Sequence, residues 1–214
     1  MFVSQVLGDG RAVQFFSTAP APSACRHWTF LDKNKNEIRL EWCDASFLEA
    51  VRSVYVNAYA HDGLYREFFE APNLDAAKEI LNHSWSERVA KYRQKLQKKP
   101  PEANFAVAKK GLEIIGFALF ETRTRGSFPL EEVYLSPLMI SPKAQGTGVG
   151  KELLFSILRQ MPDLKRITLH TRKRLPAASF YKHLGFREAQ AACREGAVFL
   201  EWINPSVSSA VRCA

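Results

Sequence analysis

Short apolar runs bounded by polar turns recur along the chain and predict the strands of a β-sheet. Residues 37–43 alternate between apolar and polar side chains, which is typical of a strand with one buried face. Residues 104–109 and 114–122 flank the turn Lys110-Gly111-Leu112-Glu113, so we expect an antiparallel hairpin. Residues 133–140 are apolar and β-branched enough for a buried strand. The remaining predicted strands cover residues 166–171, 186–189 and 197–203.

Apolar residues three or four positions apart predict two helices before the hairpin. The first is capped by Asp44 or Ser46 and ends at His61-Asp62-Gly63. Its apolar face consists of Phe47, Val51, Val54, Tyr55 and Ala58. The second is long, over about residues 74–98, and Pro100-Pro101 cannot continue it. Its apolar residues are Leu81, Trp85, Val89, Tyr92 and Leu96, spaced 4, 4, 3 and 4 apart.

Two more helices follow the strand at 133–140. One ends at Pro162 and has Leu154, Leu158 and Met161 on one face. The other covers residues 177–184, with Gly185 as its C-terminal cap. From residue 37 the element order is therefore β-α-α-β-β-β-α-β-α-β. This order predicts a single α/β (α+β) domain, a mixed sheet with helices packed against it.

The two ends of the chain have a different pattern. Residues 2–7 and 11–16 flank Gly8-Asp9-Gly10, which predicts a β-hairpin with a glycine turn. Residues 18–23 are rich in proline, alanine and serine, as in a linker. We therefore expect an N-terminal arm at 1–36, a domain at 37–205 and a flexible tail at 206–214.

Composition limits the classes of function. The chain has 214 residues, 46% of them hydrophobic, and a formal net charge of +8, which favours an anionic ligand. The basic clusters carry no interleaved aromatic residues, so nucleic-acid binding is not expected. No apolar run reaches membrane-spanning length, and no signal peptide is apparent. Four scattered cysteines argue against a metal site and suit the reducing environment of the cytoplasm. We expect either a monomer or a homodimer.

The most informative stretch is a glycine-rich turn between the strand at 133–140 and the helix that follows. It reads Gln145-Gly146-Thr147-Gly148-Val149-Gly150-Lys151. A strand, such a turn and a helix direct unpaired backbone N–H groups at one point, where a phosphate can bind. The dinucleotide pattern G-x-G-x-x-G fails at Lys151, and the Walker pattern fails at Gln145 and Glu152. A glycine-rich turn without a ligand remains the alternative for these residues alone.

Two motifs give the chain a resemblance to a known family. Gln145, Gly148 and Gly150 match (Gln/Arg)-x-x-Gly-x-(Gly/Ala), which resembles the acetyl-coenzyme-A loop of the GNAT (Gcn5-related) N-acetyltransferase superfamily. Residues 177–186, AASFYKHLGF, are similar to that superfamily's other hallmark, A-x-x-F-Y-x-x-x-G-F. The resemblance covers roughly residues 39–204. It implies a GNAT fold, with six to seven strands, about four helices and two central strands that splay apart.

The resemblance also implies a reaction, the direct transfer of acetyl from acetyl-CoA to an amine in a ternary complex. Tyr181 matches the tyrosine that protonates the departing thiolate, and we expect it to be turned away from the sheet-packing face of Phe180 and Leu184. The implied cofactor contacts come from the glycine-rich loop, from the end of the strand at 133–140, and from the second motif and the residues just before it. They are Leu138, Met139, Ile140, Gln145, Gly146, Thr147, Gly148, Val149, Gly150, Lys151, Arg174, Ser179 and Tyr181.

The base that deprotonates the amine is less defined. Glu132 begins the anchoring strand, and period-two alternation places it on the same side as Tyr134, Leu138 and Ile140 unless a bulge intervenes. Some members of the superfamily carry a general-base glutamate at about the position of Tyr134. Glu132 is our candidate base, relayed through water, or else a solvent-facing carboxylate. Glu121 and His170 are further candidates.

Two features leave the function open. Many members of the superfamily have an asparagine where this chain has Arg174, so a protein that binds acyl-CoA without turnover, as a sensor or scaffold, is the alternative. The acceptor is a small molecule or a protein amine. Asp62, Glu67 and Glu70 lie in a segment that borders the acceptor site in the resembling fold, and their charge would suit a cationic amine.

Overall fold

The computed structural model describes residues 27–61, 71–99, 101–122, 132–190 and 195–205, together with the strand backbones at 4–6 and 12–14. Strands β1 (Ser4–Val6) and β2 (Ala12–Gln14) pair antiparallel with each other. All other strands belong to one sheet. They are β3 (His27–Leu31), β4 (Glu37–Cys43), β5 (Ala103–Lys110), β6 (Glu113–Thr122), β7 (Glu132–Ile140), β8 (Arg166–Arg172), β9 (Arg187–Glu188) and β10 (Ala197–Ile203).

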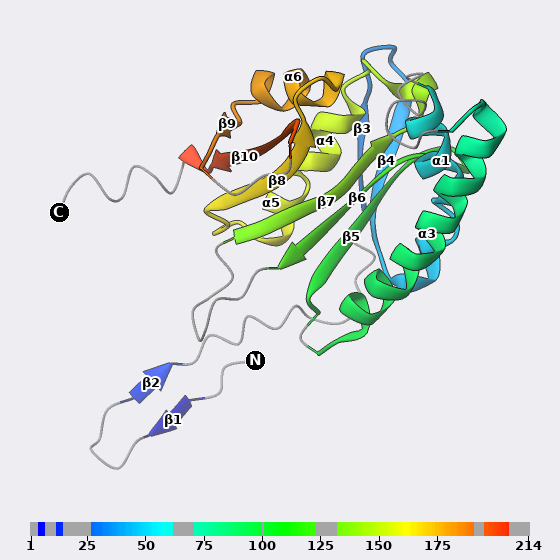
Figure 1. Cartoon of the computed structure of the whole chain (residues 1–214). Helices are drawn as coiled ribbons and strands as arrows, with labels where there is room; N and C mark the ends of the chain where they lie inside the picture. Colours follow the sequence, from blue (N-terminus) through cyan, green and yellow to red (C-terminus); the bar gives the residue numbers. More distant parts are fainter. Residues whose placement is uncertain are drawn as a thin grey trace.

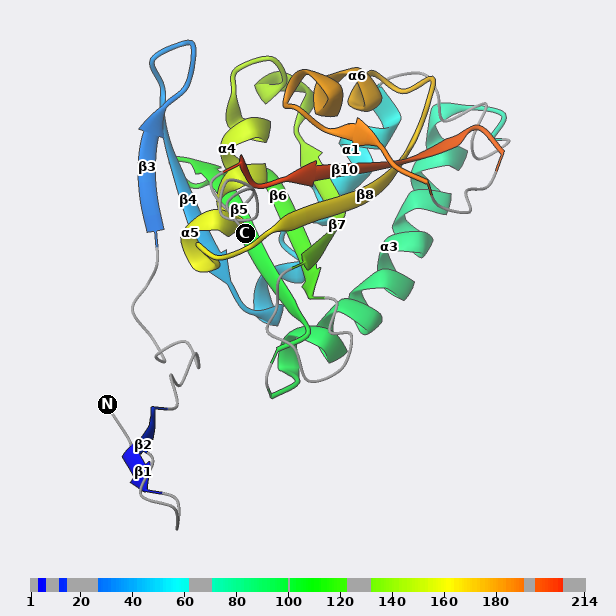
Figure 2. The same cartoon turned by 90° about the vertical axis from the view of Figure 1, so that its left-hand side faces the viewer.

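The large sheet has eight strands in the order β3-β4-β5-β6-β7-β8-β10-β9 (Figure 1). Neighbouring strands pair antiparallel except β7 and β8, which are parallel. The predicted mixed sheet is therefore confirmed. The sequence pattern had placed residues 27–31 in the N-terminal arm, whereas in the structure they form the edge strand β3, paired with β4 (Figure 2). This adds a strand to the predicted six or seven.

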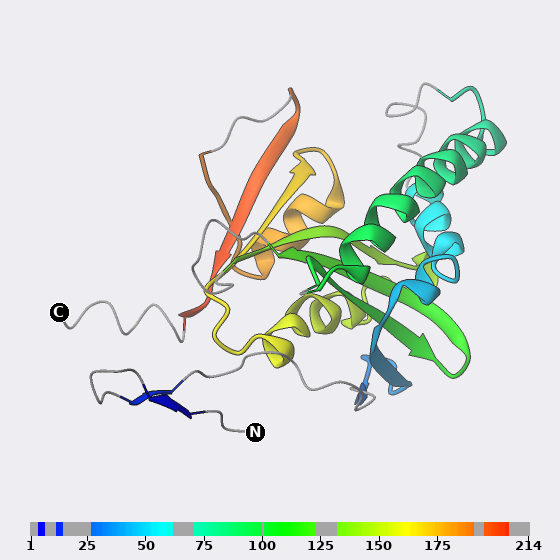
Figure 3. The same ribbon diagram turned by 90° about the horizontal axis from the view of Figure 1, so that it is seen from below.

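Helices cover both faces of the sheet (Figure 3). One face carries the 3₁₀ helix η1 (Ala45–Leu48), α1 (Arg52–His61) and α3 (Leu74–Gln97). The other carries α4 (Val149–Phe155) and α5 (Ile157–Gln160), while α6 (Pro176–His183) packs against β8. The short 3₁₀ helix η2 (Pro142–Ala144) follows β7. The one predicted helix before Pro162 is thus two short helices, which meet at Ser156.

Each face of the sheet has its own apolar core. Beneath α1 and α3 the centre is Trp85, fully buried, with ring centroids 4.8 Å from Tyr55 and 5.5 Å from Phe117. The predicted stripe of α3 is confirmed, because Leu81, Trp85, Val89 and Tyr92 are all buried. Burial of each such side chain contributes roughly 2 kcal/mol. This buried apolar core holds α1 and α3 against their face of the sheet.

A β-bulge interrupts β7. Between the paired residues Leu135 and Leu138, Ser136 and Pro137 lie opposite Leu119 alone. An extra residue of this kind bends a strand and shifts the following side chains to the other face.

The bulge corrects the alternation expected for a regular strand. Leu138 and Ile140 pack with Val133 in the core beneath α4. They therefore lie on the face opposite to that of Glu132 and Tyr134, because Glu132 and Tyr134 precede the bulge and alternate with Val133.

The parallel pairing of β7 and β8 is short. It runs from Glu132 and Arg166 to Tyr134 and Thr168, and ends there. The bulge begins two residues later, so β7 bends away from β8 where their pairing stops. The predicted splay is confirmed, and we call this divergence the strand split.

Candidate active site

The glycine-rich loop follows η2 at the end of β7. Gly146 and Gly148 have φ angles of 75° and 98°, in the left-handed region that a side chain rarely adopts. Gly148 is the N-terminal cap of α4. These two glycines therefore let the chain turn directly from η2 into α4.

The loop presents its backbone outward. Within the described part of the chain, the N–H groups from Gly146 to Gly150 have no acceptor. The Thr147 side chain is turned inward, and its Oγ1 donates to the Ala144 carbonyl at 2.7 Å. A row of free N–H donors is the set that phosphate oxygens require, so the residues present fit a pyrophosphate.

A hydrogen bond from a distant element holds the loop in place. The Lys33 N–H, in the turn between β3 and β4, donates to the Thr147 carbonyl at 3.0 Å. That turn is itself ordered by Asp32, whose carboxylate accepts from the backbone N–H groups of Asn34 and Asn36. The β3–β4 hairpin thus braces the loop, a role that the sequence pattern did not indicate.

The other predicted cofactor contacts surround the loop. Gln145 and Lys151 are exposed, and Leu138, Met139 and Ile140 are partly buried at the end of β7. Val149 is fully buried and belongs to the core. Its side chain therefore anchors α4, and only its backbone can face a ligand.

Gly150 brings α4 close to α6. A Cβ at this position would lie 3.3 Å from the Phe180 ring and 3.5 Å from Ile140. The missing side chain leaves room for Phe180 against α4. As a result α6 is rotated so that Tyr181, in the next position, points inward.

Tyr181 corrects the predicted orientation of α6. Its side chain is only 7% exposed and lies in the core, with its ring 5.4 Å from that of Phe186, whereas Phe180 and Leu184 are only partly buried. The Tyr181 hydroxyl has no hydrogen-bond partner among the described residues.

Two other phenols approach that of Tyr181. Burial raises the pKa of Tyr181 above its ordinary value, and Tyr59 of α1 and Tyr134 of β7 act in the same direction. Burial likewise raises the pKa of Tyr59 to about 12. Tyr181 and Tyr59 therefore stay protonated at neutral pH and can donate protons. Sequence reasoning missed Tyr59, because it belongs to neither motif and lies outside the apolar face predicted for its helix.

Tyr134 also contacts His170 across the strand split. The Tyr134 hydroxyl lies 3.3 Å from His170 Nδ1, and the His170 ring packs 4.8 Å from Phe199. His170 is exposed, pairs with Phe199 of β10, and lies two residues beyond the last position at which β8 pairs with β7. It is therefore not a core histidine but a surface one beside the split.

The two candidate carboxylates have cationic partners. Glu132 lies 2.9 Å from Arg166 Nη2 and accepts a 3.2 Å hydrogen bond from Thr168, at the paired end of β7. Glu121 lies 2.5 Å from Lys95 Nζ of α3. Neither carboxylate is a free base as the structure stands.

The remaining predicted residues are peripheral or lie elsewhere. Arg174 is exposed before α6, and Ser179 is exposed on it, with its carbonyl 2.8 Å from His183 Nδ1. Asp62, Glu67 and Glu70 lie outside the described residues.

Metal binding and membrane crossing find no support in the described ranges. No cluster of three His, Cys, Asp or Glu side chains able to hold a metal occurs within residues 27–205 where they are described. None of the helices described above has both the length and the apolar character needed to cross a bilayer. Burial raises the pKa of the Cys43 thiol to about 12, which keeps it unreactive at neutral pH.

Solved structures share this fold. PaiA N-acetyltransferase from Thermoplasma acidophilum, in complex with coenzyme A, is similar with a TM-score of 0.61 and 16% identity, over 78% of this chain and 99% of that one. The GNAT domain of S. lividans PAT has a TM-score of 0.60 and 15% identity, over 83% and 97%. The ribosomal-protein-S18-alanine N-acetyltransferase from Escherichia coli has a TM-score of 0.52 and 16% identity, over 78% and 93%. Among curated proteins, no sequence matches significantly.

At these identities the structural likenesses concern the fold alone. The sequence itself carries a family match, to the model described as "Acetyltransferase (GNAT) family", over residues 64–186. That range covers more than half of the chain and includes the glycine-rich loop, the strand split and Tyr181. With this match and this fold together, the chain belongs to the acetyltransferase (GNAT) family.

Proposed function

We propose that this protein transfers the acetyl group of acetyl-CoA to a primary amine by direct attack in a ternary complex. The observation that carries the proposal is the position of the glycine-rich loop. Its free N–H groups, from Gly146 to Gly150, lie at the end of the strand that diverges from β8. A phosphate donor set beside an opened pair of strands suits an acylated coenzyme. When bound, acetyl-CoA supplies the activated thioester.

The chain's own residues hold the coenzyme and direct it. The loop amides bind the pyrophosphate, with the exposed cation Lys151 beside them. The backbone of Leu138, Met139 and Ile140 lines the diverging edge of β7, where an N–H can polarise the acyl carbonyl. Arg174 and Ser179 contribute from the approach to α6 and from α6 itself.

Tyr181 is the general acid. Its buried phenol stays protonated, its hydroxyl has no partner among the described residues, and it donates its proton to the leaving thiolate. The neighbouring phenols of Tyr59 and Tyr134 favour the neutral form, so Tyr181 holds its proton until sulfur departs.

We favour His170 as the base. Tyr134, whose hydroxyl lies 3.3 Å from His170 Nδ1, lies between the amine and the imidazole and passes the proton from one to the other. Imidazole can accept a proton near neutral pH, and His170 lies on the open part of β8. Glu132, the candidate from sequence, is the second choice because Arg166 and Thr168 already occupy its oxygens.

An alternative is a protein that binds acyl-CoA without turnover, as a sensor or scaffold. The observation in its favour is that both Glu132 and Glu121 are ion-paired. Binding of acetyl-CoA without release of free thiol, in the presence of a broad panel of amines, would establish this alternative.

Calorimetric titration with acetyl-CoA tests the proposal. We expect wild type to bind and Gly148→Glu to lose at least about 100-fold in affinity. The variant places a carboxylate in the phosphate site, and its side chain strains the backbone at a φ of 98°. The matched control is Gly111→Glu. Gly111 also has a positive φ, 58°, with open space around it, but lies in the β5–β6 turn. Absence of binding by wild type, or equal loss in both variants, would refute the assignment.

A further inference from the structure

We propose that a pocket between α3 and the β6–β7 strands binds a carboxylate carried by the acceptor amine, with Arg88 and Lys91 as the recognising cations. This inference rests on the proposed transfer function and specifies its substrate class. The pocket has a volume of about 410 Å³. Most of its lining comes from α3, and Glu121 of β6 and Ser136 of β7 close it. We call it the α3 pocket.

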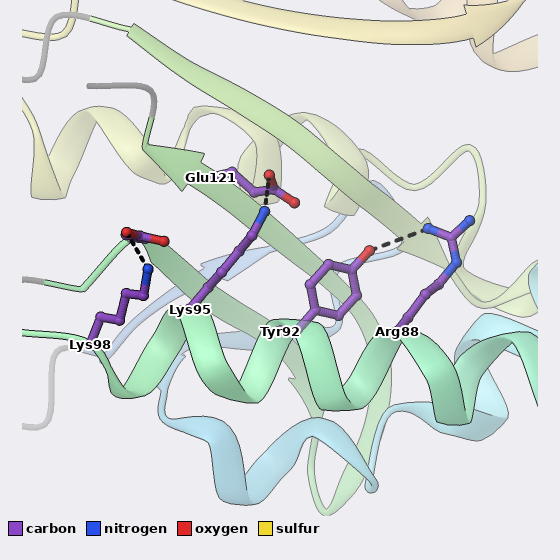
Figure 4. A network of polar contacts seen from close by, with 6 residues as sticks. Arg88, Tyr92, Lys95, Lys98 and Glu121 are labelled. Carbon is purple, nitrogen blue, oxygen red and sulfur yellow. Dashed lines mark hydrogen bonds and ion pairs between the residues drawn. The ribbon is translucent and has the colours of Figure 1, made fainter. Parts of the chain in front are cut away.

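The charges in the α3 pocket are unevenly satisfied. Its lining carries the cations Arg88, Lys91 and Lys95 and the carboxylates Glu87 and Glu121. Lys95 and Glu121 neutralise each other at 2.5 Å (Figure 4). Glu87 extends toward His83, with 3.4 Å between its Oε1 and the imidazole Nε2.

Among the described residues, two cations therefore remain without an acidic partner. Arg88 donates to the Tyr92 hydroxyl, at 3.4 Å, and to no carboxylate of that part of the chain (Figure 4). Lys91 has no ion pair with any carboxylate in the part of the chain that the structure describes. A guanidinium and an ammonium one helical turn apart suit an anion, and the planar guanidinium pairs with both oxygens of a carboxylate.

The pocket adjoins the strand split. Ser136, in its lining, belongs to the β7 bulge, which begins two residues after the last paired position of β7 and β8. An acceptor with its carboxylate on Arg88 and Lys91 can therefore direct its amine past Ser136 toward the split.

The pocket favours a carboxylate over a phosphate. The lining holds three cations and two carboxylates, a net charge of +1, which one carboxylate neutralises and a phosphate dianion would exceed. The carboxylate belongs to a small amino acid or to an acidic residue next to an amine in a peptide. This preference is the opposite of the cationic acceptor suggested by Asp62, Glu67 and Glu70.

Matched probe pairs test the inference. Each pair joins a carboxylate to its amide, with no second carboxylate present: 4-aminobutyrate and 4-aminobutanamide, alanine and alaninamide, and the C-terminally amidated dipeptides Lys-Asp-NH₂ and Lys-Asn-NH₂. Binding to the protein with coenzyme A present is measured by calorimetry, and turnover with acetyl-CoA by release of free thiol. We expect at least one carboxylate to bind about tenfold or more tightly than its amide.

The variant Arg88→Gln/Lys91→Gln should remove that preference while affinity for acetyl-CoA stays unchanged. Arg93→Gln is the control, because it removes one charge from an exposed position of α3 outside the lining. Equal binding of acid and amide, no binding of any probe, or equal loss in the control would overturn the inference. Carboxylate binding without turnover of any probe would refute the proposed function and leave the pocket assignment standing.

Discussion

The glycine-rich loop and the α3 pocket both adjoin β7, yet the loop offers backbone groups and the pocket offers side chains. The loop is a run of consecutive residues that offers backbone N–H groups, and its side chains point inward, as in Thr147, or out to solvent, as in Gln145. The α3 pocket is made of side chains from α3, β6 and β7, which the fold brings together. One site is a property of local chain conformation, and the other is a property of packing.

This difference predicts different sensitivities. A backbone site depends on glycines that adopt positive φ, so side-chain truncation should matter little there. A side-chain site depends on the charges of individual residues and should change its selectivity when one is neutralised. Substitutions in the two regions should therefore differ in the property that they change, affinity for the coenzyme in one and selectivity for the acceptor in the other.

The largest expected effect is that of Tyr181→Phe. Loss of the acid should lower kcat by about 100-fold or more, with unchanged affinity for acetyl-CoA and for the acceptor. Because burial raises the pKa of Tyr181 above 10, its deprotonation should cause no loss of wild-type activity below about pH 10. Thiol release over a pH series measures both effects. Unchanged kcat in the variant would remove Tyr181 from the mechanism.

A smaller effect distinguishes the bases on the acceptor side. His170→Gln should lower kcat by roughly 10- to 100-fold and remove the acidic limb of its pH profile, whereas Glu132→Gln should change kcat only a few-fold. The profile of kcat against pH is the measurement. Calorimetry with acetyl-CoA provides the control, since neither change touches the loop. If Glu132→Gln has the larger effect, the sequence-based candidate is the base.

The smallest effect tests the brace on the loop. Lys33→Pro removes the N–H that donates to Thr147, so affinity for acetyl-CoA should fall about three- to tenfold. Lys33→Ala keeps that N–H and should have the smaller effect. Carboxylate preference should be the same in both variants. If alanine costs more than proline, the lysine charge rather than its backbone supports the loop.

Much of the fold followed from local pattern. The strands, the buried stripe of α3 and the mixed sheet were predictable, because each depends on periodic apolar residues within one element. β3 was not predicted, since its partly buried residues do not separate from an irregular arm without knowledge of β4. Pro137 is a local signal of a bulge, because proline lacks the N–H of a central strand, but the alternation of apolar residues did not place that bulge.

For the site, the sequence by itself determined the glycine-rich loop, because glycine spacing fixes the local backbone conformation and hence the free N–H donors. Only the tertiary structure decided which way Tyr181 points, since the contact between Gly150 and Phe180 joins two separate helices. It also decided that Glu132 and Glu121 are paired, that Lys33 braces the loop, and that Glu121 and Ser136 close a pocket beside Arg88 and Lys91. Each of these depends on residues far apart in the chain, whose proximity no local pattern encodes.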